Sequence, residues 1–174
     1  MQLDLSKIRQ AQDHFERTFE PAQVAMPDDP YRIVAPVHLA FDIHKDKDKF
    51  RVVGTVRTEL ELACSRCLEP FRMPVDQRFD LRYHPQAEAS SEPEVEVGAE
   101  DLETSFYRDE QIDLNEMMRE QFYLTLPMKP LCRDDCKGLC AQCGTNLNTA
   151  TCDCAPEWED PRLAALKQFK NPSH

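Results

Sequence analysis

The stretch "VVGTVRTELELACSRCLEPFRMPVDQRFDLRY", residues 52–83, alternates apolar and charged side chains on both sides of a Cys-x-x-Cys pair. A period of two over a dozen residues is typical of a β-strand with one buried face and one wet face. The short polar link at residues 65–70 predicts an antiparallel hairpin that carries Cys64 and Cys67 at its end. The apolar faces of the two halves hold Val52, Val56, Leu60, Leu62 and Cys64, then Phe71, Met73, Val75, Phe79, Leu81 and Tyr83.

The same alternation precedes this hairpin in residues 31–43, where apolar side chains recur at every second position. Three such stretches joined by short links predict an antiparallel sheet or a partly open barrel. Ser6 as an N-cap and apolar residues on one side favour a helix at residues 6–19. A second helix is predicted after Asp113, with Glu116 three residues on as in a capping box. The expected fold class is therefore α+β.

The chain divides into three expected regions. Residues 1–30 hold the N-terminal helix and a proline-rich linker, residues 31–155 the β-rich domain, and residues 156–174 a C-terminal helix and tail. Within the domain, residues 85–100 are acidic, lack aromatic side chains and predict a mobile loop. Residues 131–154 form its cysteine-rich region.

The charge is uneven along the chain. The net charge is −11, yet residues 85–120 hold 12 acidic and 2 basic residues and so contribute −10 of it. This composition argues against a general nucleic-acid binder, although a basic face on the remainder stays possible. The apolar runs are far shorter than the roughly 20 residues that span a bilayer, and the first residues do not read as a signal peptide. We therefore expect a cytoplasmic protein without membrane contact.

Eight cysteines are the strongest chemical signal. Cytosolic thiols stay reduced, which favours metal binding over disulfides. The eight make two complete four-thiolate sites for structural zinc, one or both of them filled. Spacing favours a local site and a second site that ties the hairpin end to the C-terminal region; the alternative joins Cys64 and Cys67 to Cys140 and Cys143. The favoured sets are Cys140, Cys143, Cys152 and Cys154, then Cys64, Cys67, Cys132 and Cys136.

Other chemistries fit the cysteines less well. An iron–sulfur cluster also takes four thiolates. A redox dithiol usually starts a helix after a strand, whereas Cys64 and Cys67 lie in a predicted hairpin. No histidine, serine elbow or glycine-rich loop suggests a catalytic residue or a small-molecule substrate.

Basic residues interleave with the cysteines. If a metal gathers these segments, five cations collect at one end of the molecule and could contact RNA phosphates. The opposing interpretation is that they offset the formal −2 charge of each four-thiolate zinc site. The five candidates are Arg66, Arg72, Lys129, Arg133 and Lys137.

The stretches "CSRCLEPF" (64–71), "IDLNEMMREQFYLTLPMKPLC" (112–132), "CKGLCAQCGTNLN" (136–148) and "CDC" (152–154) resemble the bacterial YceD-like proteins, the large ribosomal RNA subunit accumulation proteins. The likeness covers roughly residues 30–155. It implies a small cytosolic protein, not known as an enzyme, that supports accumulation of 23S ribosomal RNA. The family's cysteine motifs fall on the eight cysteines named above.

These observations predict a non-enzymatic assembly factor for the large ribosomal subunit, with one or two structural zinc ions. Its expected partners are large-subunit ribosomal RNA or precursor particles, and a basic ribosomal protein for the acidic segment. The alternatives are an adaptor or chaperone for one basic ribosomal protein, and a thiol redox enzyme.

Overall fold

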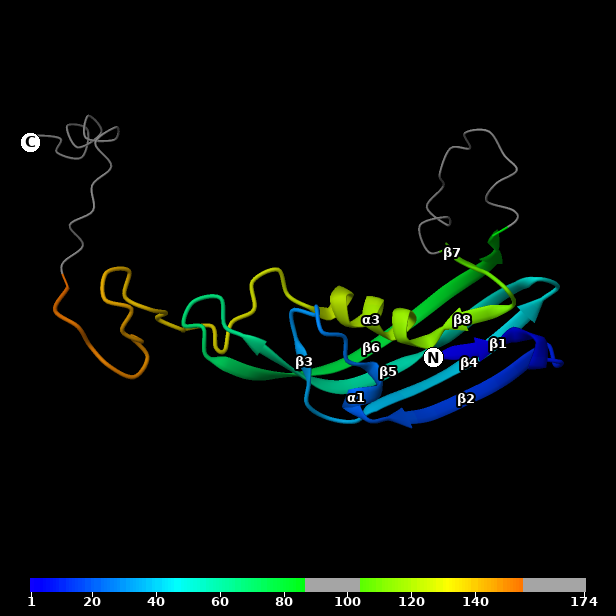
Figure 1. The fold of residues 1–174 in the computed structure, drawn as a ribbon, viewed down its shortest axis with the longest axis horizontal. Helices are drawn as coiled ribbons and strands as arrows, with labels where there is room; N and C mark the ends of the chain where they lie inside the picture. The colour runs from blue at the N-terminus through cyan, green and yellow to red at the C-terminus, as the bar shows by residue number, and fades with distance from the viewer. Residues whose placement is uncertain (87–103, 155–174) are drawn as a thin grey trace, which may run out of the picture.

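The computed structural model describes residues 1–86 and 104–154, which form an open sheet and a cysteine-rich end (Figure 1). The expected C-terminal helix, and residues 87–100 of the expected acidic loop, lie outside the described residues. In chain order the elements are β1 (Gln2–Asp4), a 3-10 turn (Leu5–Lys7), β2 (Gln12–Phe19), α1 (Pro21–Val24), β3 (Arg32–Ile33), β4 (Val37–Asp46), β5 (Lys49–Ala63), β6 (Pro70–Pro85), β7 (Thr104–Tyr107), β8 (Gln111–Asp113) and α3 (Leu114–Thr125).

The β5–β6 hairpin is the longest feature of the sheet. Its antiparallel register runs from the pair Phe50 and Tyr83 to the pair Ala63 and Pro70. Val56 is fully buried on its inner face, as the alternating pattern predicts. The hairpin extends past the rest of the sheet, so its closing turn lies between the sheet and the cysteine-rich segment (Figure 1).

The sheet is open rather than a closed barrel. Its strand order is β2-β4-β5-β6-β7, and β3 pairs with β5 beside β4. The β4-β5-β6 meander is antiparallel, as predicted, whereas β7 runs parallel to β6. The stretch at residues 31–43 forms two strands instead of one because Pro36, which has no N–H to donate, falls between β3 and β4.

One face of the sheet carries the main core. Helix α3 packs on it, as does the two-stranded β1–β8 ladder (Figure 1). The side chain of Asp113 accepts a hydrogen bond from the N–H of Asn115 at 2.8 Å, which confirms the predicted cap of α3. The helix buries Leu114, Met117, Met118 and Phe122 against the sheet. In the described part of the chain, no helix has the length and apolarity that a membrane crossing requires.

The predicted helix at residues 6–19 is wrong. The structure has the 3-10 turn there, followed by β2, which pairs with β4 along its whole length. Phe15 and Phe19 are four residues apart, a spacing that puts side chains on one face of a helix and equally on one face of a strand. Phe15 stacks on Phe41 of β4 with ring centroids 4.8 Å apart, and Phe19 is fully buried. Pairing with the sheet therefore overrides the local helical pattern.

A side chain at Gly54 is predicted to destabilise the sheet. A Cβ there would collide with the backbone carbonyl oxygen of Ala40 and with Cβ of Phe41 on the neighbouring strand. We expect Gly54→Ala to lower the free energy of unfolding by about 1–3 kcal/mol, the usual cost of overpacking, measured by urea denaturation. Val53→Thr, a change on the opposite and partly exposed face, is the matched control and should cost less than about 0.5 kcal/mol. Equal stability of both variants would contradict this packing.

Candidate metal centres

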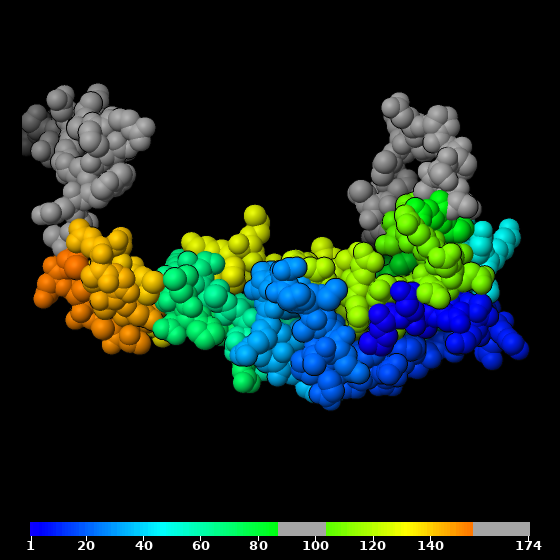
Figure 2. Space-filling model, in the orientation of Figure 1, coloured from blue at the N-terminus to red at the C-terminus, as the bar shows by residue number. Residues whose placement is uncertain are grey.

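The eight cysteines gather in two groups of four at the end of the molecule opposite the N-terminus. In each group the four sulfur atoms lie within 4.8 Å of one another. We call Cys64, Cys67, Cys132 and Cys136 the inner tetrad, and Cys140, Cys143, Cys152 and Cys154 the outer tetrad. These are the two sets that the sequence spacing favoured, and the alternative grouping of Cys64 and Cys67 with Cys140 and Cys143 does not occur. We call residues 130–154 the cysteine-rich lobe, and in Figure 2 its amber and orange part lies beyond the turn of the β5–β6 hairpin.

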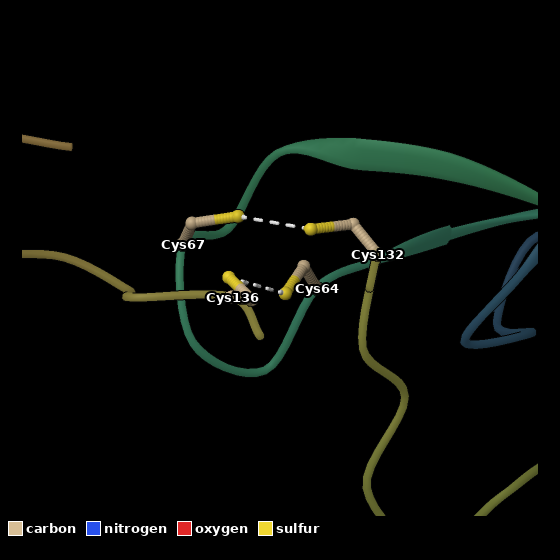
Figure 3. A group of neighbouring side chains, drawn as sticks. All are labelled: Cys64, Cys67, Cys132 and Cys136. Carbon is tan, nitrogen blue, oxygen red and sulfur yellow. Dashed lines mark hydrogen bonds between the residues drawn. The ribbon is translucent and has the colours of Figure 1, made fainter. Parts of the chain in front are cut away.

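The inner tetrad joins two segments that are distant in sequence. Cys64 and Cys67 come from the turn of the β5–β6 hairpin (Figure 3). Cys132 and Cys136 follow the connector, residues 126–130, which leaves α3. The backbone N–H of Ser65 donates to the carbonyl of Pro130 at 2.8 Å, which sets the connector beside the turn. Three of the sulfur-bearing residues are at most 3% exposed, and Phe71, Leu131 and Leu139 pack around them. The inner tetrad is therefore a small second core.

The sulfur spacing fits a tetrahedral metal site. The sulfurs of Cys64 and Cys136 are 3.7 Å apart, as are those of Cys67 and Cys132. A disulfide would bring two sulfurs to about 2.05 Å, so these are free thiols. Tetrahedral zinc with Zn–S bonds of about 2.3 Å separates its sulfurs by about 3.8 Å. The four sulfurs in Figure 3 point toward one common centre, as such an ion requires.

The outer tetrad has the same turn chemistry in a more open setting. The N–H of Gly144 donates to the carbonyl of Cys140 at 2.9 Å, closing the Cys-x-x-Cys turn. Cys143 is exposed, whereas Cys140 and Cys152 are partly buried. An ion held here would meet solvent and competing ligands more readily than one in the inner tetrad.

Hydrogen bonds favour thiolate at one cysteine of each tetrad in particular. The pKa of Cys64 is lowered to about 6, chiefly because the backbone N–H of Cys67 donates to its sulfur. The pKa of Cys143 is also lowered to about 6, because the hydroxyl and the N–H of Thr145 donate to that sulfur. Thiolate is the form that binds metal, so both sulfurs are prepared for a cation at neutral pH.

Other cysteines of the same tetrads hold their protons more tightly. Burial raises the pKa of Cys132 to about 12, and hydrogen bonding with Cys143 raises the pKa of Cys154 to about 12. Each tetrad of the free protein therefore shares protons among its sulfurs. A divalent cation that binds there displaces those protons, which makes its affinity fall as the pH falls.

Asn148 links the two tetrads, and the sequence reasoning missed it. It lies in the segment between Cys143 and Cys152, yet its amide nitrogen donates to the sulfur of Cys136 at 3.3 Å. Its amide oxygen accepts from the backbone N–H of Lys137 and from Arg133, both at 2.8 Å. Hydrogen bonds to a ligand sulfur orient it and tune its charge. The sequence signal for this role is the run "TNLN" after the last Cys-x-x-Cys, because asparagine side chains in turns often form hydrogen bonds with the backbone.

The five predicted RNA-contacting cations do not form one free patch. Arg66 donates to the carbonyl oxygens of Asp134 and Cys136, at 3.3 and 2.8 Å, and so braces the inner tetrad. Arg72 forms an ion pair with Glu59, 3.3 Å away. Arg133 pairs with Asp135 at 3.4 Å and also donates to Asn148.

Lys129 and Lys137 complete the predicted set of cations. Among the described residues no ion pair of either amino group is found. Three of the five predicted cations thus make intramolecular contacts, and contact of the five with RNA stays a prediction.

The described residues form an open, mostly β-sheet protein with two cysteine tetrads that could each hold a metal ion. Comparison with known proteins makes this more specific. Residues 52–170 match the model of the YceD family, described as large ribosomal RNA subunit accumulation protein YceD, and the chain belongs to that family. The resemblance drawn from the cysteine motifs is thereby confirmed.

Curated relatives agree with this assignment. The large ribosomal RNA subunit accumulation protein YCED homolog 1, chloroplastic, of Arabidopsis thaliana is 28% identical over 162 residues, which cover 78% of this chain and 49% of the relative. Its namesake in Zea mays is 28% identical over 145 residues, covering 70% and 49%. An uncharacterized protein of Mycobacterium tuberculosis is 36% identical over 123 residues, covering 70% and 56%. The chain spans about half the length of these relatives, and no solved structure matches it significantly.

Removal of the Asn148 amide is predicted to weaken metal binding by the inner tetrad. Asn148→Ala loses the donor to Cys136 and the acceptor for Lys137, so we expect the affinity for Zn²⁺ to fall about 10- to 100-fold. A competition titration with a chromogenic chelator measures this. The control is Thr151→Ala, an exposed position in the same segment, which should leave the affinity unchanged. Equal affinity of both variants would show that Asn148 does not support the site.

Proposed function

We propose that this chain is a non-enzymatic assembly factor for the large ribosomal subunit, supporting accumulation of 23S ribosomal RNA, with a structural zinc ion in each tetrad. Membership of the YceD family carries the ribosomal part of the proposal. The sulfur geometry of the tetrads carries the zinc part.

Zinc suits these tetrads better than the alternatives. Structural zinc sites are closed by four protein ligands, whereas catalytic sites usually keep a position open for water or substrate. Four thiolates would fill every position in each tetrad. Four cysteines also bind iron–sulfur clusters, but the 3.7 Å sulfur pairs match a single tetrahedral ion. A thiol redox enzyme needs one accessible pair, and in the inner tetrad Cys64 and Cys67 are both buried.

The inner ion has a structural task in this proposal. The connector and the hairpin turn meet around the inner tetrad, and few backbone hydrogen bonds besides the one from Ser65 to Pro130 hold them there. Binding of zinc to such sites supplies roughly 10 kcal/mol or more in isolated peptides. That is comparable to the whole stability of a small domain, typically about 5–15 kcal/mol. The lobe of residues 130–154 would keep its position only while the inner ion is bound.

A second candidate function is an adaptor for one basic ribosomal protein. It is favoured by the intramolecular contacts of Arg66, Arg72 and Arg133, with which a phosphate would have to compete. Both candidates predict a role in large-subunit assembly. They differ in whether the protein contacts ribosomal RNA or one basic ribosomal protein.

Zinc release is predicted to occur in two phases. Purified protein should hold two zinc ions, and a chelator should remove the outer ion faster, because Cys143 is exposed while Cys64 and Cys136 are buried. Release followed with a zinc-sensitive dye measures both rates. Cys152→Ser with Cys154→Ser should abolish only the fast phase. A single phase that this double variant leaves unchanged would contradict the assignment.

Comigration with large-subunit precursors is the expected behaviour in cells. Lysate separated on a sucrose gradient at low and high salt should show the protein with these precursors, and its deletion should lower the amount of 23S ribosomal RNA. Cys64→Ser should release the protein from the precursors, since it loses an inner ligand, whereas Thr151→Ala should not. A protein found only at the top of the gradient at both salts, with normal 23S levels after deletion, would overturn the proposed function.

A further inference from the structure

The two Cys-x-x-Cys turns share their backbone hydrogen bonds but differ in the residue after the second cysteine. The N–H of Leu68 donates to the carbonyl of Cys64 at 2.9 Å, as the N–H of Gly144 does to Cys140. Both following residues have a left-handed backbone, with φ of 61° at Leu68 and 72° at Gly144. The inner turn thus holds a leucine where the outer turn holds a glycine.

Leucine is a poor choice for this backbone. Its Cβ crowds the carbonyl oxygen in the left-handed region, where glycine has no such contact. Burial could compensate for the strain, but the Leu68 side chain is 65% exposed. The folded chain itself gains little from a leucine here, and the exposed side chain is open to contact with another molecule.

A second exposed apolar side chain lies in the adjoining segment. The connector of residues 126–130 meets the inner turn through the hydrogen bond from Ser65 to Pro130. Met128 on this connector is fully exposed. Methionine is a flexible, polarizable side chain that adapts to varied partners. Leu68 and Met128 are therefore apolar contact points on two segments that touch.

The turn that carries Leu68 holds two cysteines of the inner tetrad and also contacts the segment that carries the outer tetrad. The carbonyl of Arg66 accepts from the N–H of Leu139 at 3.1 Å, and the carboxylate of Glu69 accepts from the amide of Asn146 at 3.5 Å. A ligand on Leu68 would accordingly sense the charge of both metal sites.

That charge is negative when zinc is bound. The ionisable side chains of residues 64–70 and 126–154, apart from the thiols, balance: Arg66, Lys129, Arg133 and Lys137 against Glu69, Asp134, Asp135 and Asp153. Four thiolates around one zinc ion leave a formal −2 at each tetrad. The zinc-bound end repels a phosphate backbone and attracts a basic polypeptide.

We propose that Leu68 and Met128 form a docking surface for a basic polypeptide segment, whose apolar residues contact these two side chains while its lysines and arginines face the thiolate sites. The inference rests on the proposed function, under which a ribosomal protein of the large subunit is such a polypeptide. It assigns Leu68 to recognition rather than to folding.

The test compares Leu68→Gly, Met128→Ser and the wild type, each immobilised in the zinc-bound form. The probes are the RNA-free total protein of salt-washed large ribosomal subunits and, separately, their protein-free RNA. We expect the wild type to retain one or a few basic proteins and no RNA at physiological salt. Each substitution should lower retention at least tenfold. Retention of RNA alone, or equal retention by the wild type and both variants, would overturn the proposal.

Stability measurements separate recognition from folding. Leu68→Gly gives the inner turn the residue that the outer turn already has, so its melting temperature and zinc content should equal or exceed those of the wild type. Lower values of both would show that Leu68 supports the fold, against the inference.

The sucrose gradient separates failure of the docking surface from failure of the proposed function. Comigration of both the wild type and Leu68→Gly with precursors would support the proposed function and contradict the docking surface. Loss of comigration by the substituted protein alone supports the surface, and absence of the wild type from precursors overturns the proposed function itself.

Discussion

The meeting of four cysteine sulfurs in the inner tetrad is the constraint on which the far end of this molecule depends. Two of the sulfurs sit on the turn of the β5–β6 hairpin and two follow the connector from α3, so one cluster ties the sheet to the C-terminal region. Burial of Cys64, Cys67 and Cys136 keeps the cluster away from solvent. The main core, under α3, contains none of these cysteines, and Phe71 packs against both clusters. In the proposed zinc-bound form, the inner ion would add to the hydrogen bonds from Ser65 to Pro130 and from Leu139 to Arg66 in placing residues 130–154 relative to the sheet.

The sheet and the tetrads have different structural roles. The sheet supplies a rigid arm, because the β5–β6 register continues to the pair Ala63 and Pro70 at the edge of the inner turn. The tetrads lie at the end of that arm, where the proposed zinc ions would add negative charge and hold the backbone. Arg66 and Asn148 then bind carbonyl and sulfur atoms within the lobe, so these polar side chains maintain the shape of the end. A surface held in this way is suited to recognising a partner with little rearrangement.

Much of this arrangement follows from sequence pattern. Alternation in residues 52–83 predicts the central hairpin because a period of two has no helical counterpart over that length. Cysteine spacing predicts the outer tetrad because its two pairs are close in sequence, and the inner tetrad then follows as the remaining four cysteines. The helix predicted at residues 6–19 was wrong because the spacing of Phe15 and Phe19 fits a helix and a strand equally well. Pairing with β4 selects the strand. The roles of Asn148 and Leu68 escape the sequence since each depends on the folded turn: one on the sulfur within its reach, the other on a left-handed backbone.

The central claim is that each tetrad holds one zinc ion through four thiolates. X-ray absorption at the zinc edge of the purified protein, together with metal analysis, tests it most directly. The account predicts two zinc ions per chain, each with four sulfur neighbours at about 2.3 Å. Zinc with oxygen or nitrogen neighbours, or a protein that folds with its lobe in place and no metal, would contradict it.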